Sequence, residues 1–446
     1  MNSRLLTPAR IAVNPPRLYY GGSSHGQLER RGTMTARIAA LMAILTLGIV
    51  ISGCVFNVTS YVDKDGAIIY VGEVQNDGKP LSSPIVTGTF YDAAGTVITT
   101  RTAPACRVMP TKSVAAFELW LPPGTARPAR VEWKLSGDEV DDAFLADGLT
   151  GRLYGAGPGY PPAGTPSHFG EMTNTSPNNY LGGSGCVAWL NSGGEVVRVG
   201  EIQAAGLRFN AGSTLPFLVS EDVPADAVDA VFFLDAGVTP PGQDSFRVID
   251  IPLSAYTHTS KVFGSGAPFY FGFGELHNSE SSPISPAIIA TTRDASGALN
   301  GLGDSKGLCN VPAPAGGFTY LGYGFRSAAP AGTPADVRVE ATIADHAASL
   351  KSIQVSGVTK SAAGAPYLVT VRGKVKNTTA VTLSAVNVCA ATYDSTGNVS
   401  SVFPGSATLG ADGLAPGATA TFSVEVPSFG TVASVNAVAA GRPKAP

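Results

Sequence analysis

The sequence predicts an all-β protein built from tandem antiparallel β-sandwich repeats. Three observations predict this fold: only 14% of the 446 residues are charged, the chain contains 53 glycines and 33 prolines, and one alternating pattern recurs four times. Such a composition suits short strands joined by many turns, whereas long solvated helices and coiled coils need more charged residues.

In the first repeat, apolar residues at every second position mark the strands, and polar residues with glycine mark the turns. One alternating segment ends in the turn signal Asn76-Asp77-Gly78, and the next ends in a turn formed by Asp92 and Gly95. The strands that this alternation predicts are 67–75, 84–91, 97–98, 117–121 and 131–135.

The same layout recurs along the chain, which indicates internal repeats. The end of the first strand is matched at 73–76, 188–191, 275–278 and 374–377. The Asp-x-x-Gly turn recurs at 92–95, 294–297 and 394–397 and is missing from the second copy, and the penultimate strand recurs around Phe117, Phe217, Phe318 and Phe422. Each unit holds about six or seven short strands in ~90 residues, a pattern typical of an immunoglobulin-type sandwich.

Residues 34–54 predict where the protein works. Arg37 supplies a short positive region, and residues 38–50 form an apolar run that can start translocation but is too short for a lasting membrane span. The run ends in Ile51-Ser52-Gly53-Cys54, which resembles the lipobox of bacterial lipoproteins. The resemblance implies that Cys54 carries a diacylglyceryl group and becomes the N-terminus, with the lipid bilayer as its partner. The alternative is a plain transmembrane anchor with an incidental cysteine.

Two of the repeats carry a second resemblance, which concerns the modules themselves. Repeats one and four resemble the FxLYD-type immunoglobulin-like modules of bacterial surface lipoproteins. The matching segments are 72–76, 90–95, 373–377, 393–397 and 414–417. The resemblance implies a place in the bacterial cell envelope but no particular reaction, because such modules host varied binding roles.

The predicted organisation follows from these signals. Residues 1–33 are a dispensable upstream extension, 34–53 a lipoprotein signal peptide, 54–150 repeat one, 151–179 a linker rich in glycine and proline, 180–262 a degenerate repeat two, 263–348 repeat three and 349–446 repeat four. Removal of residues 1–53 leaves 24 basic and 32 acidic residues. A net charge of about −8 without a basic cluster argues against nucleic acid as a partner.

The cysteines favour disulfide bonds. Besides Cys54, the predicted mature chain has Cys106, Cys186, Cys309 and Cys389, and an even number outside the cytoplasm favours pairing. Cys106 and Cys309 occupy equivalent loops, whereas Cys186 and Cys389 are not assigned equivalent positions. Both separations, 106 to 186 and 309 to 389, are 80 residues. We therefore favour Cys106–Cys186 and Cys309–Cys389, each joining neighbouring repeats, over the alternative of four unpaired cysteines.

Three aromatic residues form a candidate binding face. Phe269, Phe271 and Phe273 share one side of a predicted strand, where outward rings can stack on a sugar or dock a partner. The alternative is burial against the neighbouring repeat. In the fourth copy the corresponding face is polar, with Thr370, Arg372 and Lys374.

No catalytic signature, metal-ligand spacing or cofactor motif is found in the sequence. The string Gly182-Gly-Ser-Gly-Cys186 fails the nucleophile motif at its last position, and the acidic run 138–142 fits a solvated loop better than a calcium site. We therefore expect an exported, lipid-anchored envelope protein, not an enzyme, that binds an envelope protein or polysaccharide or has a structural role. The alternatives are a carbohydrate-binding lipoprotein that uses Phe269–Phe273 and, as a third class, an envelope hydrolase.

Overall fold

The computed structural model describes residues 53–141, 145–157, 167–219, 221, 223–238, 247–252, 256–263, 268–304, 309, 311–327, 329, 333–343, 350–363 and 367–444. The regular secondary structure in this part of the chain consists of β-strands, and the strands pair antiparallel. The predicted all-β class of tandem sandwiches is therefore confirmed. The predicted upstream extension and signal peptide, apart from Gly53, lie outside the described residues.

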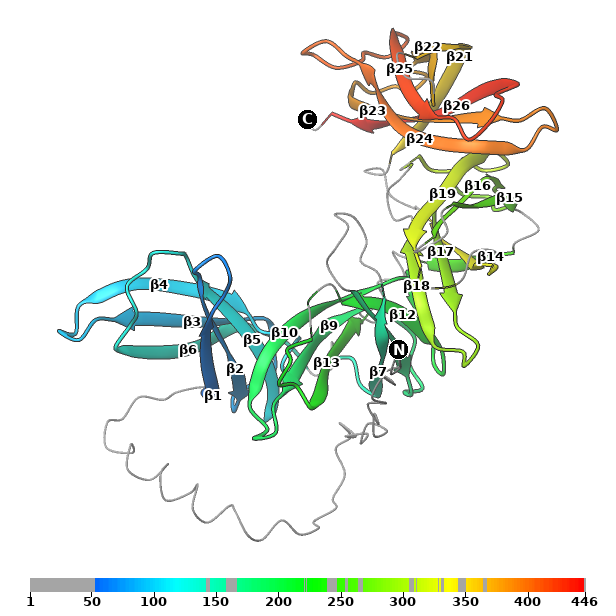
Figure 1. Ribbon diagram of the computed structural model, residues 1–446. Helices are drawn as coiled ribbons and strands as arrows, with labels where there is room; N and C mark the ends of the chain where they lie inside the picture. Colours follow the sequence, from blue (N-terminus) through cyan, green and yellow to red (C-terminus); the bar gives the residue numbers. More distant parts are fainter. Residues whose placement is uncertain are drawn as a thin grey trace, which may run out of the picture.

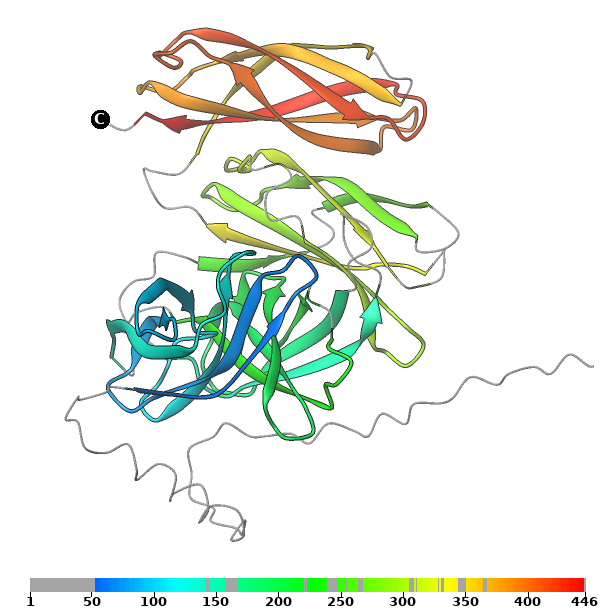
Figure 2. The ribbon, with the colours of Figure 1, turned by 60° about the vertical axis from the view of Figure 1, so that its left-hand side comes forward.

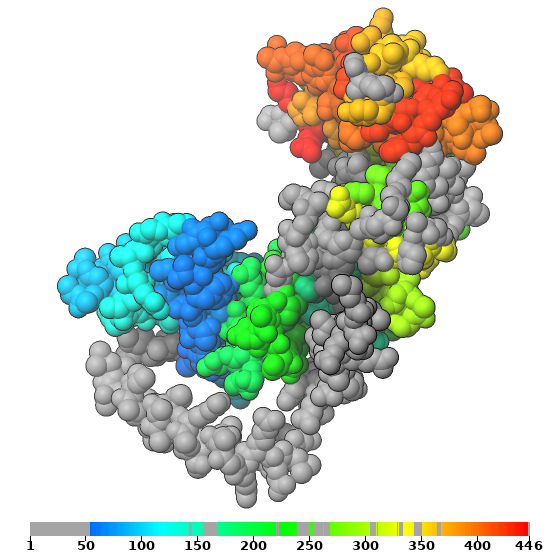
Figure 3. All heavy atoms as spheres, viewed as in Figure 1, coloured from blue at the N-terminus to red at the C-terminus, as the bar shows by residue number. Residues whose placement is uncertain are grey.

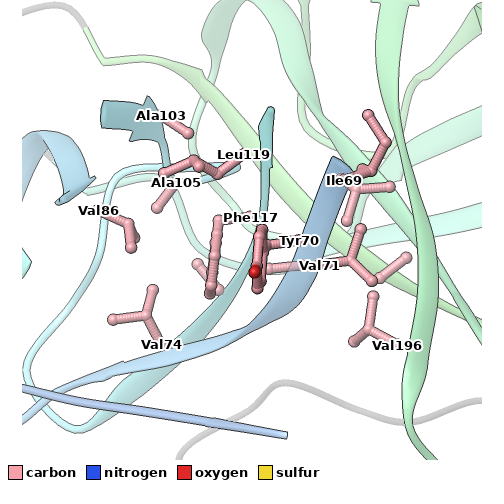
Figure 4. Close-up of a cluster of buried hydrophobic side chains, with 14 of the residues drawn as sticks. Ile69, Tyr70, Val71, Val74, Val86, Ala103, Ala105, Phe117, Leu119 and Val196 are labelled. Atoms are coloured by element: carbon pink, nitrogen blue, oxygen red, sulfur yellow. The ribbon is translucent and has the colours of Figure 1, made fainter. Parts of the chain in front are cut away.

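Repeat one is a sandwich of two three-stranded sheets, ordered β1-β2-β5 and β4-β3-β6. Its strands are β1 (Gly53–Val62), β2 (Ile68–Asn76), β3 (Leu81–Tyr91), β4 (Val97–Pro104), β5 (Ser113–Leu121) and β6 (Arg130–Glu139). Tyr70, Phe90, Phe117 and Trp133 meet between the sheets, with ring centroids 5.1–5.9 Å apart. Figure 4 shows this core, including Tyr70 and Phe117, and on its far side Val71 facing Val196 of the next repeat.

Repeat two begins earlier than the sequence predicted. Its strands are β7 (Leu149–Gly157), β8 (Ser167–Asn174), β9 (Tyr180–Leu190), β10 (Val196–Ala204), β11 (Arg208–Phe209), β12 (Thr214–Val219) and β13 (Asp229–Gly237). The predicted linker 151–179 is thus wrong where it covers β7 and β8, which pair with each other; residues 158–166 lie outside the described part. Composition misled here, because Gly170 is needed in a strand: a Cβ there would lie 2.2 Å from Phe217.

Repeat three also starts before its predicted boundary at residue 263. Its strands are β14 (Arg247–Ile251), β15 (Tyr256–Phe263), β16 (Phe269–His277), β17 (Ile284–Arg293), β18 (Leu299–Asp304), β19 (Phe318–Arg326) and β20 (Asp336–Ile343). They form two sheets, ordered β14-β20-β17-β18 and β15-β16-β19. Because β14 and β15 each pair within these sheets, residues 247–262 belong to repeat three and not to repeat two.

Repeat four is a closed barrel in the order β21-β22-β25-β24-β23-β26. Its strands are β21 (Lys351–Ala362), β22 (Leu368–Lys376), β23 (Leu383–Tyr393), β24 (Val399–Thr408), β25 (Thr419–Pro427) and β26 (Ser434–Pro443). The four repeats follow one another through space in chain order, with repeat four at the end farthest from repeat one (Figures 1 and 2). In the space-filling view, the blue and cyan surface of repeat one lies against the green surface of repeat two (Figure 3).

One buried asparagine closes the same end of every repeat. Its Nδ2 donates to a carbonyl oxygen on a facing segment of the chain, and its Oδ1 accepts from the backbone N–H two residues later. The four residues, with the Nδ2 distances, are Asn76 (Met109, 3.0 Å), Asn174 (Phe209, 3.0 Å), Asn278 (Ala313, 3.0 Å) and Asn377 (Leu414, 2.8 Å). Each therefore satisfies polar backbone groups that the turn would otherwise leave buried and unpaired.

The asparagines correct the alignment of the second copy. The sequence pattern matches Asn191 to Asn76, but the structural counterpart of Asn76 is Asn174. Asn191 instead forms the turn that seemed to be missing: its Oδ1 accepts from the N–H groups of Gly193 and Glu195, as Asp92 Oδ1 accepts from Ala94 and Thr96. Asparagine and aspartate both supply the acceptor oxygen, so a search for aspartate alone overlooked this turn.

The penultimate strands need a similar correction in repeat three. In every repeat a glycine stands four positions before the buried asparagine. The residue opposite this glycine on the penultimate strand is a phenylalanine in repeats one, two and four: Phe117, Phe217 and Phe422. In repeat three it is Leu321, opposite Gly274, whereas Phe318 pairs with His277 at the strand's beginning.

We expect Asn377→Ala to destabilise repeat four by about 2–4 kcal/mol, because it leaves buried carbonyl and amide groups without partners. Urea unfolding of the whole protein should show an earlier transition. Asn398→Ala is the matched control, since that side chain is exposed and bonds only Thr396. An equal shift in both variants would contradict the proposed role of the buried asparagine.

Candidate functional site

Cys54 lies at the beginning of the part of the chain that the structure describes. It is the second residue of β1, where it pairs with Gln75 of β2, and its thiol is free and exposed. Ile51 and Ser52 of the lipobox-like string lie outside the described residues. A group attached to the Cys54 sulfur would therefore sit directly on the sandwich, with no spacer between them.

Two disulfide bonds join consecutive repeats. Cys106 of repeat one is linked to Cys186 of β9, and Cys309 of repeat three is linked to Cys389 of β23, with Cα atoms 5.3 Å apart in both pairs. The structure thus brings together the pairs that the equal spacing predicted. Disulfides form and persist in oxidising compartments, so they indicate a location outside the cytoplasm.

The two disulfides are copies of one design. Cys186 lies four residues before the end of β9 and Cys389 four residues before the end of β23, and an Asx turn follows each strand. These two cysteines are therefore equivalent, which the misaligned second copy concealed. In both cases the disulfide joins a loop of one repeat to the third strand of the next repeat, β9 or β23.

The joint between repeats two and three uses the same positions without cysteine. The Ala205 N–H donates to the Pro216 oxygen (2.9 Å), as the Cys106 N–H donates to the Ala116 oxygen (3.0 Å). Ala205 packs in one apolar cluster with Ile289, which occupies the position of Cys186 and Cys389 on β17. An apolar contact thus replaces the disulfide at this joint.

At two of the three joints, a carboxylate at the same strand position accepts a hydrogen bond from a backbone N–H of the preceding repeat. Asp235 accepts from the Val108 N–H (3.2 Å) across the first joint, and Glu340 accepts from the Leu207 N–H (2.5 Å) across the second. Burial raises the pKa of the Asp235 carboxyl above its ordinary value, although two backbone N–H groups and Arg107 oppose that shift. At the third joint the equivalent position on β26 is Ala440.

A second polar contact strengthens the first joint. Arg198 of β10 donates to the Tyr61 hydroxyl (2.6 Å), and its Nε lies 3.8 Å from Glu118. Glu118 also accepts from the Val199 N–H (3.3 Å). Burial raises the pKa of Glu118, with the Arg198 charge opposing the shift. These contacts fix the angle between the first two repeats as well as their separation.

The aromatic face of repeat three is covered by repeat four. The Phe271 and Phe273 rings lie 5.3 and 5.6 Å from the ring of Phe429, and Phe273 is only 6% exposed. Phe269 packs under the guanidinium of Arg326, 4.6 Å away. Of the two interpretations of this stripe, packing against the neighbouring repeat is the one found for Phe271 and Phe273. Phe273 is buried there and Phe271 is half-buried, so these two rings do not form a fully open face.

A chain of hydroxyl groups lies beside that interface. Tyr320 and Tyr393 are hydrogen-bonded through their hydroxyls (2.8 Å), and Tyr393 donates to Glu275 (2.7 Å). Burial raises the pKa of Tyr393 to about 12, and it raises the pKa of Tyr320 further. Both phenols stay neutral at physiological pH, as the hydrogen bonds across this joint require.

Comparison with known proteins adds no family: no protein-family model and no curated protein sequence matches the chain. In the part of the chain that the structure describes, no group of three or more His, Cys, Asp or Glu side chains could hold a metal ion. Among the same residues, no helix is long and apolar enough to cross a membrane.

The middle joint offers a direct test of the shared design. We expect the double variant Ala205→Cys/Ile289→Cys to form a third disulfide, because these positions reproduce the loop-to-strand contact of the native pairs. Free-thiol titration and non-reducing mass mapping would detect it. Ala205→Cys/Ile288→Cys is the matched control, since Ile288 lies in the core of repeat three. Two free thiols in the first variant would refute the equivalence.

The tyrosines predict an alkaline limit for the joint between repeats three and four. Folding favours the neutral phenol of Tyr393, so this contribution is complete below the ordinary tyrosine pKa of about 10 and is lost as the pH rises through about 12. Urea unfolding between these pH values should show a smaller loss of stability in Tyr393→Phe than in the wild type. The exposed Tyr367→Phe should behave as the wild type; identical profiles for all three proteins would count against this account.

Proposed function

We propose that this protein is an exported, lipid-anchored component of a bacterial cell envelope with a non-catalytic binding or structural role. The observation that carries the proposal is the pair of disulfides between consecutive repeats, because such bonds belong to proteins outside the cytoplasm. The lipobox-like string that ends at Cys54, together with the free and exposed thiol of that residue, supports the anchor.

The architecture suits presentation of a surface at a distance from the bilayer. Cys54 belongs to β1 of repeat one, and repeats one and four stand at opposite ends of the array (Figure 1). Two acyl chains on one cysteine give stable membrane attachment. Joints tied by disulfides, carboxylates and packed rings hold the repeats at fixed angles, so a partner would meet a rigid arm.

The alternative of carbohydrate binding through Phe269–Phe273 has lost its support, since repeat four covers two of the three rings. No arrangement of described residues favours the envelope hydrolase.

Intact-mass spectrometry of the natively expressed protein tests this proposal. We expect a chain that begins at Cys54 and carries acyl groups, and a gain of about four mass units on reduction of its two disulfides. Cys54→Ser should abolish both the acyl mass and the membrane fraction, whereas Cys106→Ser/Cys186→Ser should keep both. An unacylated protein with an intact N-terminus would overturn the anchor.

A further inference from the structure

The outer face of repeat four differs from the corresponding faces of the other repeats. In repeats one to three, the sheet that contains β2, β8 or β16 has an apolar outward face, and the next repeat covers this face. The residues concerned are Ile69, Val71, Phe169, Phe271 and Phe273. At the corresponding positions of β22, seven and five residues before the buried Asn377, repeat four has Thr370 and Arg372. Three residues before Asn377 it has Lys374, where the other repeats have glutamate. Figures 1 and 2 show β22 and β25 on the side of repeat four that faces away from repeat three.

Three cations form a column along this face. Arg372, Lys374 and Lys376 alternate on β22, so they project on the same side about 7 Å apart, and all three are exposed. Among the described residues, none of the three takes part in an ion pair. The acidic residue nearest in the register is Glu425, which lies opposite Thr370 at one end of the column.

Hydroxyl groups flank the cations on both sides. The strand register places Thr359 and Ser423 beside Arg372, and it places Ser356 and Thr421 beside Lys374. Hydroxyls can both donate and accept hydrogen bonds, so they match the hydroxyls of a sugar ring. The face therefore combines a line of positive charge with two lines of neutral polar groups.

A hollow of about 580 Å³ lies at Lys374. Its polar lining comes from Lys374, Thr408, Thr419 and Thr421, and the rest of its lining consists of leucine, alanine and glycine residues. Its charged lining residue is a lysine and three others carry hydroxyls, so its donors suit an anionic group. Thr408 occupies the position that Cys106, Ala205 and Cys309 hold in the other repeats, so the hollow lies where a following repeat would dock.

We propose that this surface, the basic face of repeat four (Arg372, Lys374, Lys376 and the hollow), binds a linear anionic glycan. One carboxylate, sulfate or phosphate group of the glycan sits in the hollow beside Lys374, and neighbouring anionic groups follow the column. The inference rests on the proposed binding role and names the class of partner. The predicted mature chain is acidic overall, whereas this face carries three cations in a row, so it attracts a polyanion against the net charge of the chain.

The test uses full-length protein in detergent, with polygalacturonate and dextran sulfate as probes and neutral dextran as the comparison. We expect both anionic polymers to bind with an affinity that falls as salt rises, and dextran not to bind. Lys374→Gln/Lys376→Gln should weaken binding about tenfold, as loss of two exposed charge contacts implies. Lys64→Gln/Lys134→Gln removes the same charge from exposed positions of repeat one and should bind as the wild type.

Binding of only one anionic polymer supports the inference and identifies the preferred anionic group. The inference is overturned by no binding of either anionic polymer, by equal binding of dextran, or by an equal loss in both double variants. Mass analysis of the same sample separates the two proposals. A diacylated protein that binds no polymer refutes only the basic face, whereas an unacylated protein that binds refutes only the anchor.

Discussion

In repeats one to three, the sheet that contains β2, β8 or β16 has an apolar outer face. The burial of this face under the next repeat is the constraint on which the whole array depends. Val71, Phe169 and Phe273 are at most 6% exposed, although each points out of its own sandwich. Full burial of one such side chain is worth about 1.5–3 kcal/mol. A repeat released from its neighbour would expose this patch to water, so each of the first three repeats needs the one that follows it.

The three joints satisfy this constraint with overlapping sets of contacts. The first has both a disulfide and a carboxylate, the second has a carboxylate and an apolar contact, and the third has a disulfide with a tyrosine–glutamate bond. The loop that follows β4, β10 or β18 is the common element: its residue at the position of Cys106 meets β9, β17 or β23 of the next repeat. Repeat arrays of this kind are stabilised by such nearest-neighbour contacts.

The sequence was sufficient for the fold and for the covalent links, because alternation, turn residues and equal cysteine spacing are local or countable signals. It failed where one residue type serves two purposes. Asn191 matched the strand-ending asparagine in type but forms a turn, and Gly170 looked like part of a linker but makes room for Phe217. Burial of Phe273 could not be predicted, since it depends on Phe429, about 160 residues later, and on the angle between two repeats. Alignment by Asx turns instead of by aspartate would have recovered the register of the second copy, and with it the equivalence of Cys186 and Cys389.

The position of the disulfides also determines how the chain lengthens under tension. A pull applied between Cys54 and the C-terminal strand travels along the backbone until it reaches Cys106, and there it passes through sulfur to Cys186; the same bypass occurs between Cys309 and Cys389. The residues inside each loop carry no load, whatever the state of their hydrogen bonds. At about 3.4 Å per extended residue, each 80-residue loop withholds roughly 270 Å of contour length. Even with every sheet opened, the protein would remain a much shorter tether than its residue count allows.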